Sequence, residues 1–475
     1  MTNIFGGYYD WKVNGGQRWL SASGVTKGNL AEAPNGKTDL SFDGQTKYNH
    51  GMLFTLNHIQ KFSDKWSGFI NGGYGHYSEH KNDPNSGSLT LGDNGKLSGK
   101  FRDYVSDSKS SYWQVGVSNK AAIGNVKNDL SFAVDYFMYK SKAANSGSAA
   151  GQATIGGDLW NGVHIIGTPI AAADIDSVGY SKEYAYAATL ADRFEFGKAS
   201  LYAALQYRDT ETESASGAKV SKDSLNPTFA IAYKPVENLS VYASYAQSYT
   251  KPVEVSKDYV NKGEIFDPIK NRQTEIGVKY ENAGMLHSFA LFQLDQASYM
   301  VEGDTANPAD AYYTQNGKNE FKGIEYSITG KVVPKWNVMG GLMYLHGERT
   351  DTPSVSWDST AKKLKPTTSK NGWYATGTPK WNAVLATEYE ADQNNSAIFR
   401  MNYVGKSHVN DNGVMAPDYM TFDLGYKHKT KINSTPVTLT AMCYNVLGKD
   451  YWISRGTSVA LGAPRTMMLS AQFDI

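Results

Sequence analysis

The chain has 475 residues, and its 47 lysines and arginines nearly cancel its 46 aspartates and glutamates, so it lacks the basic excess typical of nucleic-acid-binding proteins. Its single cysteine, Cys443, excludes an internal disulfide and a cysteine-based zinc site. The mean hydropathy is −0.48, and no run approaches the roughly 18 apolar residues of a spanning helix, which excludes a bundle of membrane helices.

The first residues, MTNIFGGYYDWKVNGG, have neither a basic n-region nor an apolar h-region, so they show no export signal. From residue 49 onward, period-2 alternation and turn signals predict about seventeen strands. They cover residues 49–62, 65–78, 111–122, 126–139, 181–196, 198–209, 226–235, 238–248, 272–282, 285–298, 319–331, 334–346, 381–390, 395–404, 419–429, 436–446 and 465–474. Most reach the nine to eleven residues or so that a tilted strand needs to cross a bilayer, whereas soluble strands cluster at about five or six.

The connections alternate between tight turns and long irregular stretches. Tight turns fall at 63–64, 124–126, 234–238, 281–285 and 331–335, and long connections at 79–110, 140–180, 249–271, 299–318 and 347–380. Short turns at one end and long loops at the other are typical of outer-membrane barrels, and the high tyrosine and glycine content agrees with that class. A β-propeller would need four short strands and a periodic motif in each blade, and neither is present. We therefore predict an all-β fold, a transmembrane antiparallel β-barrel.

The alternation also assigns the two faces of the wall. In the stretch from Arg272 to Glu281, Ile276 and Val278 share one parity with other apolar residues, while the opposite parity is polar and includes Glu275. The stretch FKGIEYSITG repeats the arrangement, with Glu325 on its polar parity. Because successive side chains of a strand point to opposite faces, the apolar set should meet lipid and the two glutamates should face a polar lumen.

The last residues, MLSAQFDI, fit an amphipathic final strand. Leu469, Ala471, Phe473 and Ile475 share one parity, which we expect to face lipid. An aromatic residue two positions before an apolar terminus resembles the signal read by the barrel-assembly machinery.

Several stretches taken together resemble the TonB-dependent siderophore receptors of Gram-negative outer membranes. They are NPTFAIAYKPVENLSVYASYAQSYTKP (226–252), RQTEIGVKYENAGMLHSFALFQLD (272–295), NGKNEFKGIEYSITGKVVPKWNVMGGLMYLHGE (316–348), GTPKWNAVLATEYE (377–390) and YNVLGKDYWISRGTSVALGAPRTMMLSAQFDI (444–475). The resemblance implies an outer-membrane barrel of about 22 strands with an N-terminal plug, importing ferric siderophores with energy from the TonB complex.

The front of the chain departs from that family pattern. No TonB-box-like segment and no plug is recognisable, and about seventeen of the roughly 22 strands are predicted. We therefore expect residues 1–48 to be mostly an extracellular loop with the remainder of the preceding strand, residues 49–475 to be the barrel domain, and the chain to be a truncated receptor.

Candidate site residues come from two lines of argument. By resemblance, Glu275 and Glu325 match barrel-wall glutamates that pair with plug arginines, although here the plug would lie outside the chain. A ferric chelate presents organic surface and often negative charge, so aromatic and basic residues of the long loops and strand tops are candidates for ligand binding. These candidates are Tyr104, Tyr299, Tyr313, Trp373, Tyr374 and Arg455.

Other functional classes receive less support. His76 and His80 share one strand parity, but two histidines without a third ligand seldom form a metal site, and we predict no metal and no cofactor. The sequence contains no H-E-x-x-H, G-x-S-x-G or Walker A motif, so no enzyme is predicted. A passive porin-like or adhesin-like outer-membrane barrel remains the alternative function, because neither requires a plug or energy coupling.

Overall fold

The computed structural model describes residues 1–16, 19–26, 28–84, 87–146, 152–255, 258–307 and 310–474. The fold in these ranges is all-β, and the only helical turns are two short 3₁₀ segments, η1 (Asp93–Gly95) and η2 (Ile175–Ser177). None of the described helices is long and apolar enough to cross a membrane.

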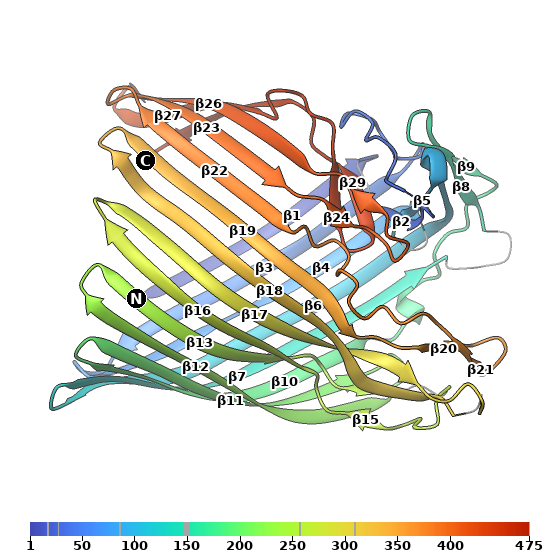
Figure 1. Cartoon of the computed structure of the whole chain (residues 1–475), viewed down its shortest axis with the longest axis horizontal. Coiled ribbons are helices and arrows are strands. Elements are labelled where there is room, and N and C mark those ends of the chain that lie inside the picture. Colours follow the sequence, from blue (N-terminus) through green and yellow to red (C-terminus); the bar gives the residue numbers. More distant parts are fainter. Residues whose placement is uncertain are drawn as a thin grey trace.

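Long antiparallel strands, each paired with its neighbour along the chain, wrap around a central space (Figure 1). The described residues supply eighteen of these strands. They are β1 (Thr2–Asn14), β3 (Thr46–Lys61), β4 (Trp66–Pro84), β6 (Lys96–Ile123), β7 (Val126–Asn145), β10 (Ser181–Phe196), β11 (Ala199–Glu213), β12 (Lys219–Val236), β13 (Leu239–Tyr249), β16 (Lys270–Asn282), β17 (Met285–Glu302), β18 (Tyr312–Val333), β19 (Trp336–Asp351), β22 (Trp381–Glu390), β23 (Asn395–Val404), β26 (Tyr419–Ile432), β27 (Thr435–Tyr444) and β30 (Thr466–Phe473). The predicted transmembrane antiparallel barrel is therefore confirmed in its architecture.

The eighteenth strand is β1, which the sequence analysis does not separate from the loop that follows it. All thirteen of its residues pair with β3, from Thr2 opposite His58 to Asn14 opposite Thr46. At the other end of the sheet, β30 pairs with β27. Among the described residues no pairing joins β1 to β30, so the sheet has two edges and a seam between them.

Several strands extend well beyond the predicted bounds on the long-loop side. Strand β6 is predicted at 111–122 but begins at Lys96, and β18 is predicted at 319–331 but begins at Tyr312. These extensions are rich in polar residues and stand above the apolar band. A strand in water needs no lipid-facing apolar residues, so polarity alone does not reveal that the backbone remains paired there.

The long connections fold into a second, smaller set of strands. They are β2 (Leu20–Gly24), β5 (Leu89–Gly92), β8 (Thr154–Asp158), β9 (Gly162–Ile166), β14 (Val253–Glu254), β15 (Ile265–Phe266), β20 (Val355–Asp358), β21 (Lys363–Pro366), β24 (Ser407–His408), β25 (Met415–Ala416), β28 (Trp452–Arg455) and β29 (Ser458–Leu461). Pairings run from β28 through β29, β2, β5 and the start of β6 to β8 and β9, which gives one extracellular sheet.

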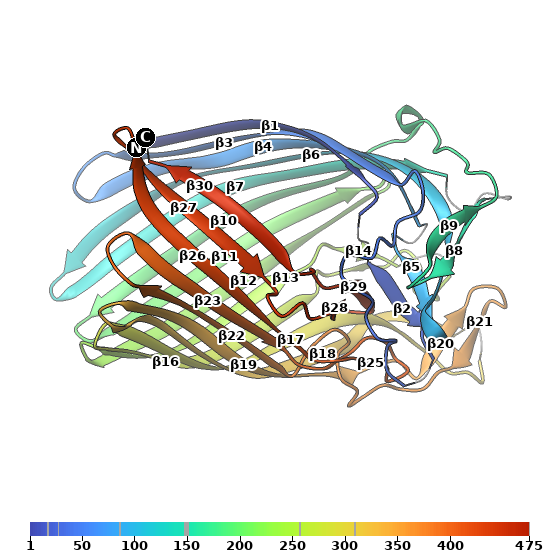
Figure 2. The ribbon, with the colours of Figure 1, turned by 90° about the horizontal axis from the view of Figure 1, so that it is seen from above.

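This extracellular sheet links loops from both ends of the chain, and Figure 2 shows it at the right-hand end of the barrel. Leu20 pairs with Val459, and the Trp452 indole N–H donates a 2.8 Å hydrogen bond to the Ala31 carbonyl. Leu20, Leu91 and Trp452 are among the fully buried side chains of the hydrophobic core in these loops. The loops thus join the N-terminal and C-terminal parts of the wall across the seam.

The register confirms the predicted faces of the wall. Ile276 lies opposite Ala243 and Leu291, and Leu291 lies opposite Ile324, so one cross-strand row collects apolar side chains. Ile276 is 53% exposed, as expected of a side chain that meets lipid. Glu275 and Glu325 stand on the opposite face, toward the lumen. In the last strand Leu469 and Phe473 lie on the outer parity, and Ile475 lies outside the described residues.

Candidate ligand site in the barrel lumen

A charged cluster lies on the lumen face of β3, β4 and β6, at their long-loop ends. The Glu79 carboxylate is 7% exposed and makes ion pairs with Lys47 at 2.8 Å and with Lys81 at 2.6 Å, while the Tyr77 hydroxyl donates to it at 2.7 Å. A buried carboxylate is tolerated only when it is paired and hydrogen-bonded, and Glu79 meets both conditions. The cluster is therefore a fixed part of the wall.

Tyr104, a predicted ligand candidate, belongs to this cluster. The Lys81 ammonium lies 4.9 Å from the centre of its ring and the Arg102 guanidinium 4.7 Å. Arg102 is held by two 2.8 Å hydrogen bonds to Asp83, which is 2% exposed. Both cations bind the wall carboxylates Glu79 and Asp83, and together with Lys47 they outnumber these two carboxylates by one. The Tyr104 ring and its two neighbouring cations thus present apolar surface and a net positive charge, which suits an anionic organic chelate. We name Lys81, Arg102 and Tyr104 the mouth cluster.

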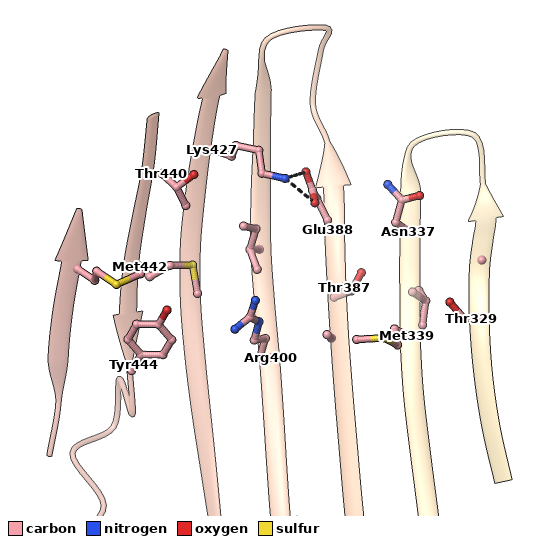
Figure 3. Close-up of a pocket in the computed structure, with 15 residues that line it drawn as sticks. Thr329, Asn337, Met339, Thr387, Glu388, Arg400, Lys427, Thr440, Met442 and Tyr444 are labelled. Carbon is pink, nitrogen blue, oxygen red and sulfur yellow. Dashed lines mark hydrogen bonds and ion pairs between the residues drawn. The ribbon is translucent and has the colours of Figure 1, made fainter. Parts of the chain in front are cut away.

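A second feature of the lumen wall lies near the short turns, across β18, β19, β22, β23, β26, β27 and β30 (Figure 3). It is a hollow of about 470 Å³. Lys427 binds both oxygens of Glu388, at 2.7 and 2.9 Å. Arg400 lies in the same hollow, is exposed, and has no ion pair among the described residues. The hollow thus offers one paired and one unpaired cation to the lumen.

The two wall glutamates differ in their surroundings. Glu275 is half-buried and accepts a 2.6 Å hydrogen bond from the Tyr242 hydroxyl. The ring of Tyr242 can reach it because Gly277 has no side chain, and a Cβ there would lie 2.5 Å from the ring. Glu325 is exposed, and no ion pair or hydrogen bond of its carboxylate occurs among the described residues. Glu275 thus has hydrogen-bond partners within the wall, and Glu325 has none among the described residues.

Tyr299 in β17 and Tyr313 in β18 lie together in an aromatic stack at the long-loop ends of these wall strands. Their ring centres are 5.4 Å apart at 12°, and Phe266 and Tyr259 stack on Tyr313 at 6.2 and 5.2 Å. This stack borders a small buried cluster that includes Ala311 and Leu364. The two tyrosines therefore hold loops together and are not placed beside the mouth cluster by any contact.

Trp373 and Tyr374 lie on the connection between β19 and β22. Tyr374 stacks on His408 at 5.4 Å and receives Lys380 over its ring at 4.1 Å, while Lys370 lies 5.4 Å from the ring of Trp373. Burial, and then the Lys380 charge, lower the pKa of His408, which favours its neutral form. The ring of Tyr374 is thus already in contact with His408 and Lys380.

The remaining candidate, Arg455, is the last residue of β28 and is exposed. No hydrogen bond or ion pair of its side chain occurs among the described residues. The six predicted ligand residues therefore fall in four places, and they stay a prediction about the region.

A nearby ion-pair network ties two of the long loops together. Asp411 binds Arg349 at 2.8 Å and Lys370 at 2.6 Å. Burial raises the pKa of the Asp411 carboxyl, but the hydrogen bonds and charges of Lys370 and Arg349 outweigh this effect and hold the pKa below its usual range. Asp411 is therefore ionised at neutral pH and fixes the loop 405–418 to the loop 367–380.

His76 and His80 bind separate carboxylates. His76 Nε2 is 2.6 Å from Asp107, and His80 Nε2 is 2.9 Å from Asp103. No group of three metal-ligating side chains occurs in the described ranges. Neither histidine is placed to share an ion with the other.

Sequence reasoning missed the cations of the mouth cluster and the hollow with Arg400. The signal for the first was present in YSEHKNDP, where Tyr77, Glu79, Lys81 and Asp83 share a parity. Tyr77 lies in the strand predicted at 65–78, but the other three residues lie in the stretch 79–110, which the sequence predicts as a long connection. Arg400 has no comparable signal in the sequence, because charged residues are expected on the lumen face of any such strand.

The fold and its lumen define a class, the outer-membrane β-barrels. Within that class, residues 2–446 match the family model described as "TonB dependent receptor-like, beta-barrel". The chain therefore belongs to the TonB-dependent receptor family, whose place is the outer membrane of Gram-negative bacteria.

Two curated relatives show how much of a receptor the chain represents. The ferrichrome receptor FcuA of Yersinia enterocolitica is 26% identical over 261 residues, which cover 53% of this chain and 32% of that receptor. The catecholate siderophore receptor Fiu of Escherichia coli K12 is 26% identical over 259 residues, covering 50% of this chain and 31% of Fiu. The matched part of the chain thus spans about a third of the length of these relatives.

Solved structures agree with the fold. The ferric preacinetobactin receptor BauA of Acinetobacter baumannii superposes with a TM-score of 0.85 at 24% identity, over 100% of this chain and 70% of that one. The siderophore receptor PiuA of the same organism gives a TM-score of 0.77 at 19% identity, over 99% and 71%.

Proposed function

We propose that the chain is the barrel wall of a receptor that binds ferric siderophores and takes them up across the outer membrane. Family membership supports the class, and the names of the relatives, a ferrichrome receptor and a catecholate siderophore receptor, support the type of ligand. The observation that carries the proposal is the mouth cluster, where the Tyr104 ring lies beside two cations on the lumen face. The role proposed is binding and transport, without a catalytic step.

Energy coupling is part of the same proposal. In it, a plug domain lying outside these 475 residues occupies the lumen and connects the barrel to the TonB complex, and arginines of that plug bind Glu275 and Glu325. The lumen position of both carboxylates and the exposure of Glu325 support this role, since a free carboxylate on the wall can accept a partner. The lipid of the outer membrane would cover the apolar rows, and the barrel-assembly machinery would insert the chain.

Chelate binding can be tested with the purified chain through its tryptophan fluorescence. Ferrichrome and a ferric catecholate are the probes, and quenching is measured against probe concentration. We expect saturable quenching by one of them, and Tyr104→Leu should weaken that binding by about tenfold through lost aromatic and cation–π contact. Tyr186→Leu is the matched control, because Tyr186 is 60% exposed on the outer face of the wall.

Equal loss in both variants, or none in either, would remove the mouth cluster from the proposal. Absence of saturable binding by either probe, together with free passage of small solutes through reconstituted protein, would favour the passive porin-like barrel instead.

A further inference from the structure

Three lysines face one another on the outer surface of the wall. They lie on β6, β7 and β10, which are neighbouring strands of the wall (Figure 1). Lys109 is directly opposite Lys140, and Lys140 is directly opposite Lys182. Like charges in direct cross-strand pairs are destabilising. An anion beside the row would relieve this repulsion, and among the described residues the chain supplies one only for Lys182.

The acidic partners of this region leave two of the lysines free. Lys182 is paired with Glu213 at 2.8 Å, and the nearby Lys142 is paired with Asp176 at 2.8 Å. Lys109 and Lys140 have no ion pair among the described residues. Asp107, on the same face two positions from Lys109, is bound instead by His76, Ser78 and Tyr180. The ammonium groups of Lys109 and Lys140 lie 5.6 Å from the rings of Tyr180 and Tyr184. Two unneutralised ammonium groups therefore stand in adjacent positions.

The position of the three lysines along the strands shows where they lie relative to the membrane. The next row on the same face contains Tyr184, and the row below it contains Tyr136 and Tyr186, whose rings are 5.2 Å apart. Below these come the apolar rows, among them Val134 and Leu190, which are 47% and 51% exposed. Aromatic residues mark the level of the headgroups, and the apolar rows mark the level of the acyl chains. The lysines thus lie at or just above the membrane interface.

We propose that Lys109 and Lys140 bind the phosphate of an anionic lipid headgroup in the outer leaflet. A phosphate can accept hydrogen bonds from two ammonium groups at once and relieves their mutual repulsion. The acyl chains attached to it would lie along the apolar rows directly beneath. This continuity of cation, aromatic ring and apolar surface on one face favours a lipid over free phosphate.

A competition between lipids tests the proposal on the full chain in neutral detergent. Phosphatidic acid is added alone or in competition with phosphatidylcholine or with inorganic phosphate, and bound lipid is counted by native mass spectrometry. We expect phosphatidic acid to be retained, and the double variant Lys109→Gln/Lys140→Gln to bind it about tenfold more weakly. Inorganic phosphate alone should not displace it at equal concentration.

Two further variants keep the result interpretable. Lys109→Arg/Lys140→Arg preserves the charges and should preserve the binding. Lys322→Gln is the matched control, because Lys322 lies on the outer face directly above the apolar row of Ile324 but is paired with Glu320 at 2.5 Å. The proposal is overturned if the Gln double variant binds phosphatidic acid within about twofold of the parent, if Lys322→Gln loses as much binding, or if inorganic phosphate competes equally.

Discussion

At the scale of single residues, the structure separates side chains that are satisfied within the wall from those that await a partner. Glu79 has two cations and a hydroxyl around it, and Asp83 has a guanidinium fork. Glu325 and Arg400 face the lumen without an ionic partner among the described residues. The ion pairs of the satisfied set fix the wall and hold the two cations of the mouth cluster beside Tyr104, while the unsatisfied set is where a second domain or another bound molecule would add interaction energy.

Glu275 and Glu325 should respond differently to neutralisation. Glu325→Gln should change the free energy of unfolding by no more than about 0.5 kcal/mol, because an exposed carboxylate without a partner contributes little. Glu275→Gln weakens the hydrogen bond from Tyr242 and should cost about 0.5 to 1.5 kcal/mol. Urea unfolding of the two variants in the same lipid measures both values. Equal costs would show that the Tyr242 contact does not distinguish the two sites.

Acid should loosen the loop that Asp411 anchors. The pKa of this carboxyl is lower in the folded protein than the unfolded value of about 3.9, so its ion pairs stabilise the loops above about pH 4 and are lost as the pH falls through the folded-state pKa. Hydrogen exchange of residues 405–418 should therefore accelerate between about pH 6 and pH 3, after correction for intrinsic rates. In Asp411→Asn the loop should be loose at both values. The same acid response in parent and variant would exclude Asp411 as the cause.

Sequence alone predicted part of the candidate site. It proposed Tyr104 because aromatic residues suit an organic ligand, but it did not find Lys81 and Arg102, whose strands pass beside that ring only once β4 and β6 are paired. Tyr299 and Tyr313 were proposed on the same ground. They stack with Phe266 and Tyr259, which lie more than thirty residues away in the chain, and local patterning carries no information about such contacts.

At the scale of elements, alternation predicted the long strands and their faces because lipid imposes a strict inside-outside rule on them. The bounds of strand β1 were not predicted within residues 1–48, where only the remainder of a strand is expected, and the reason is physical. Its outer parity carries Ile4 and Tyr8, but its lumen parity carries Phe5, Tyr9 and Trp11, so polar and apolar residues do not separate. The paired extensions above the membrane were missed because nothing requires apolar residues there.

Close packing between strands gives a prediction at this scale. Gly277→Ala places a Cβ 2.5 Å from the Tyr242 ring and should destabilise the protein by about 1 to 3 kcal/mol, since the ring must leave its contact with Glu275. Gly341→Ala on the same lumen face meets nothing nearer than 3.5 Å, at Val384, and should be neutral or mildly stabilising. Urea midpoints of both variants decide the matter. A destabilised Gly341→Ala with an unaffected Gly277→Ala would contradict the packing.

At the scale of the whole molecule, the unpaired strand edges destabilise the wall in the membrane, while the extracellular sheet stabilises it outside. Among the residues that the structure describes, strands β1 and β30 leave unpaired edges, which is costly in lipid because backbone groups there have no water to bind. Outside the membrane, the extracellular sheet pairs β2 with β29 and buries Leu20 and Trp452 in one core, which holds the two sides of the seam together. The wall is thus joined at its extracellular end and open along the seam.

The central claim is that this chain forms an outer-membrane barrel wall with the stated faces, and spin labelling tests it most directly. Single cysteines are placed at Glu275, Ile276, Val278 and Lys279 in a Cys443→Ser background, and the labelled protein is reconstituted in lipid. We predict that labels at 276 and 278 collide with oxygen dissolved in the bilayer, and that the label at 275 collides with a water-soluble nickel complex, with 279 reporting the same lumen face. Accessibility that does not alternate along the strand, or that alternates with the opposite phase, would contradict the account.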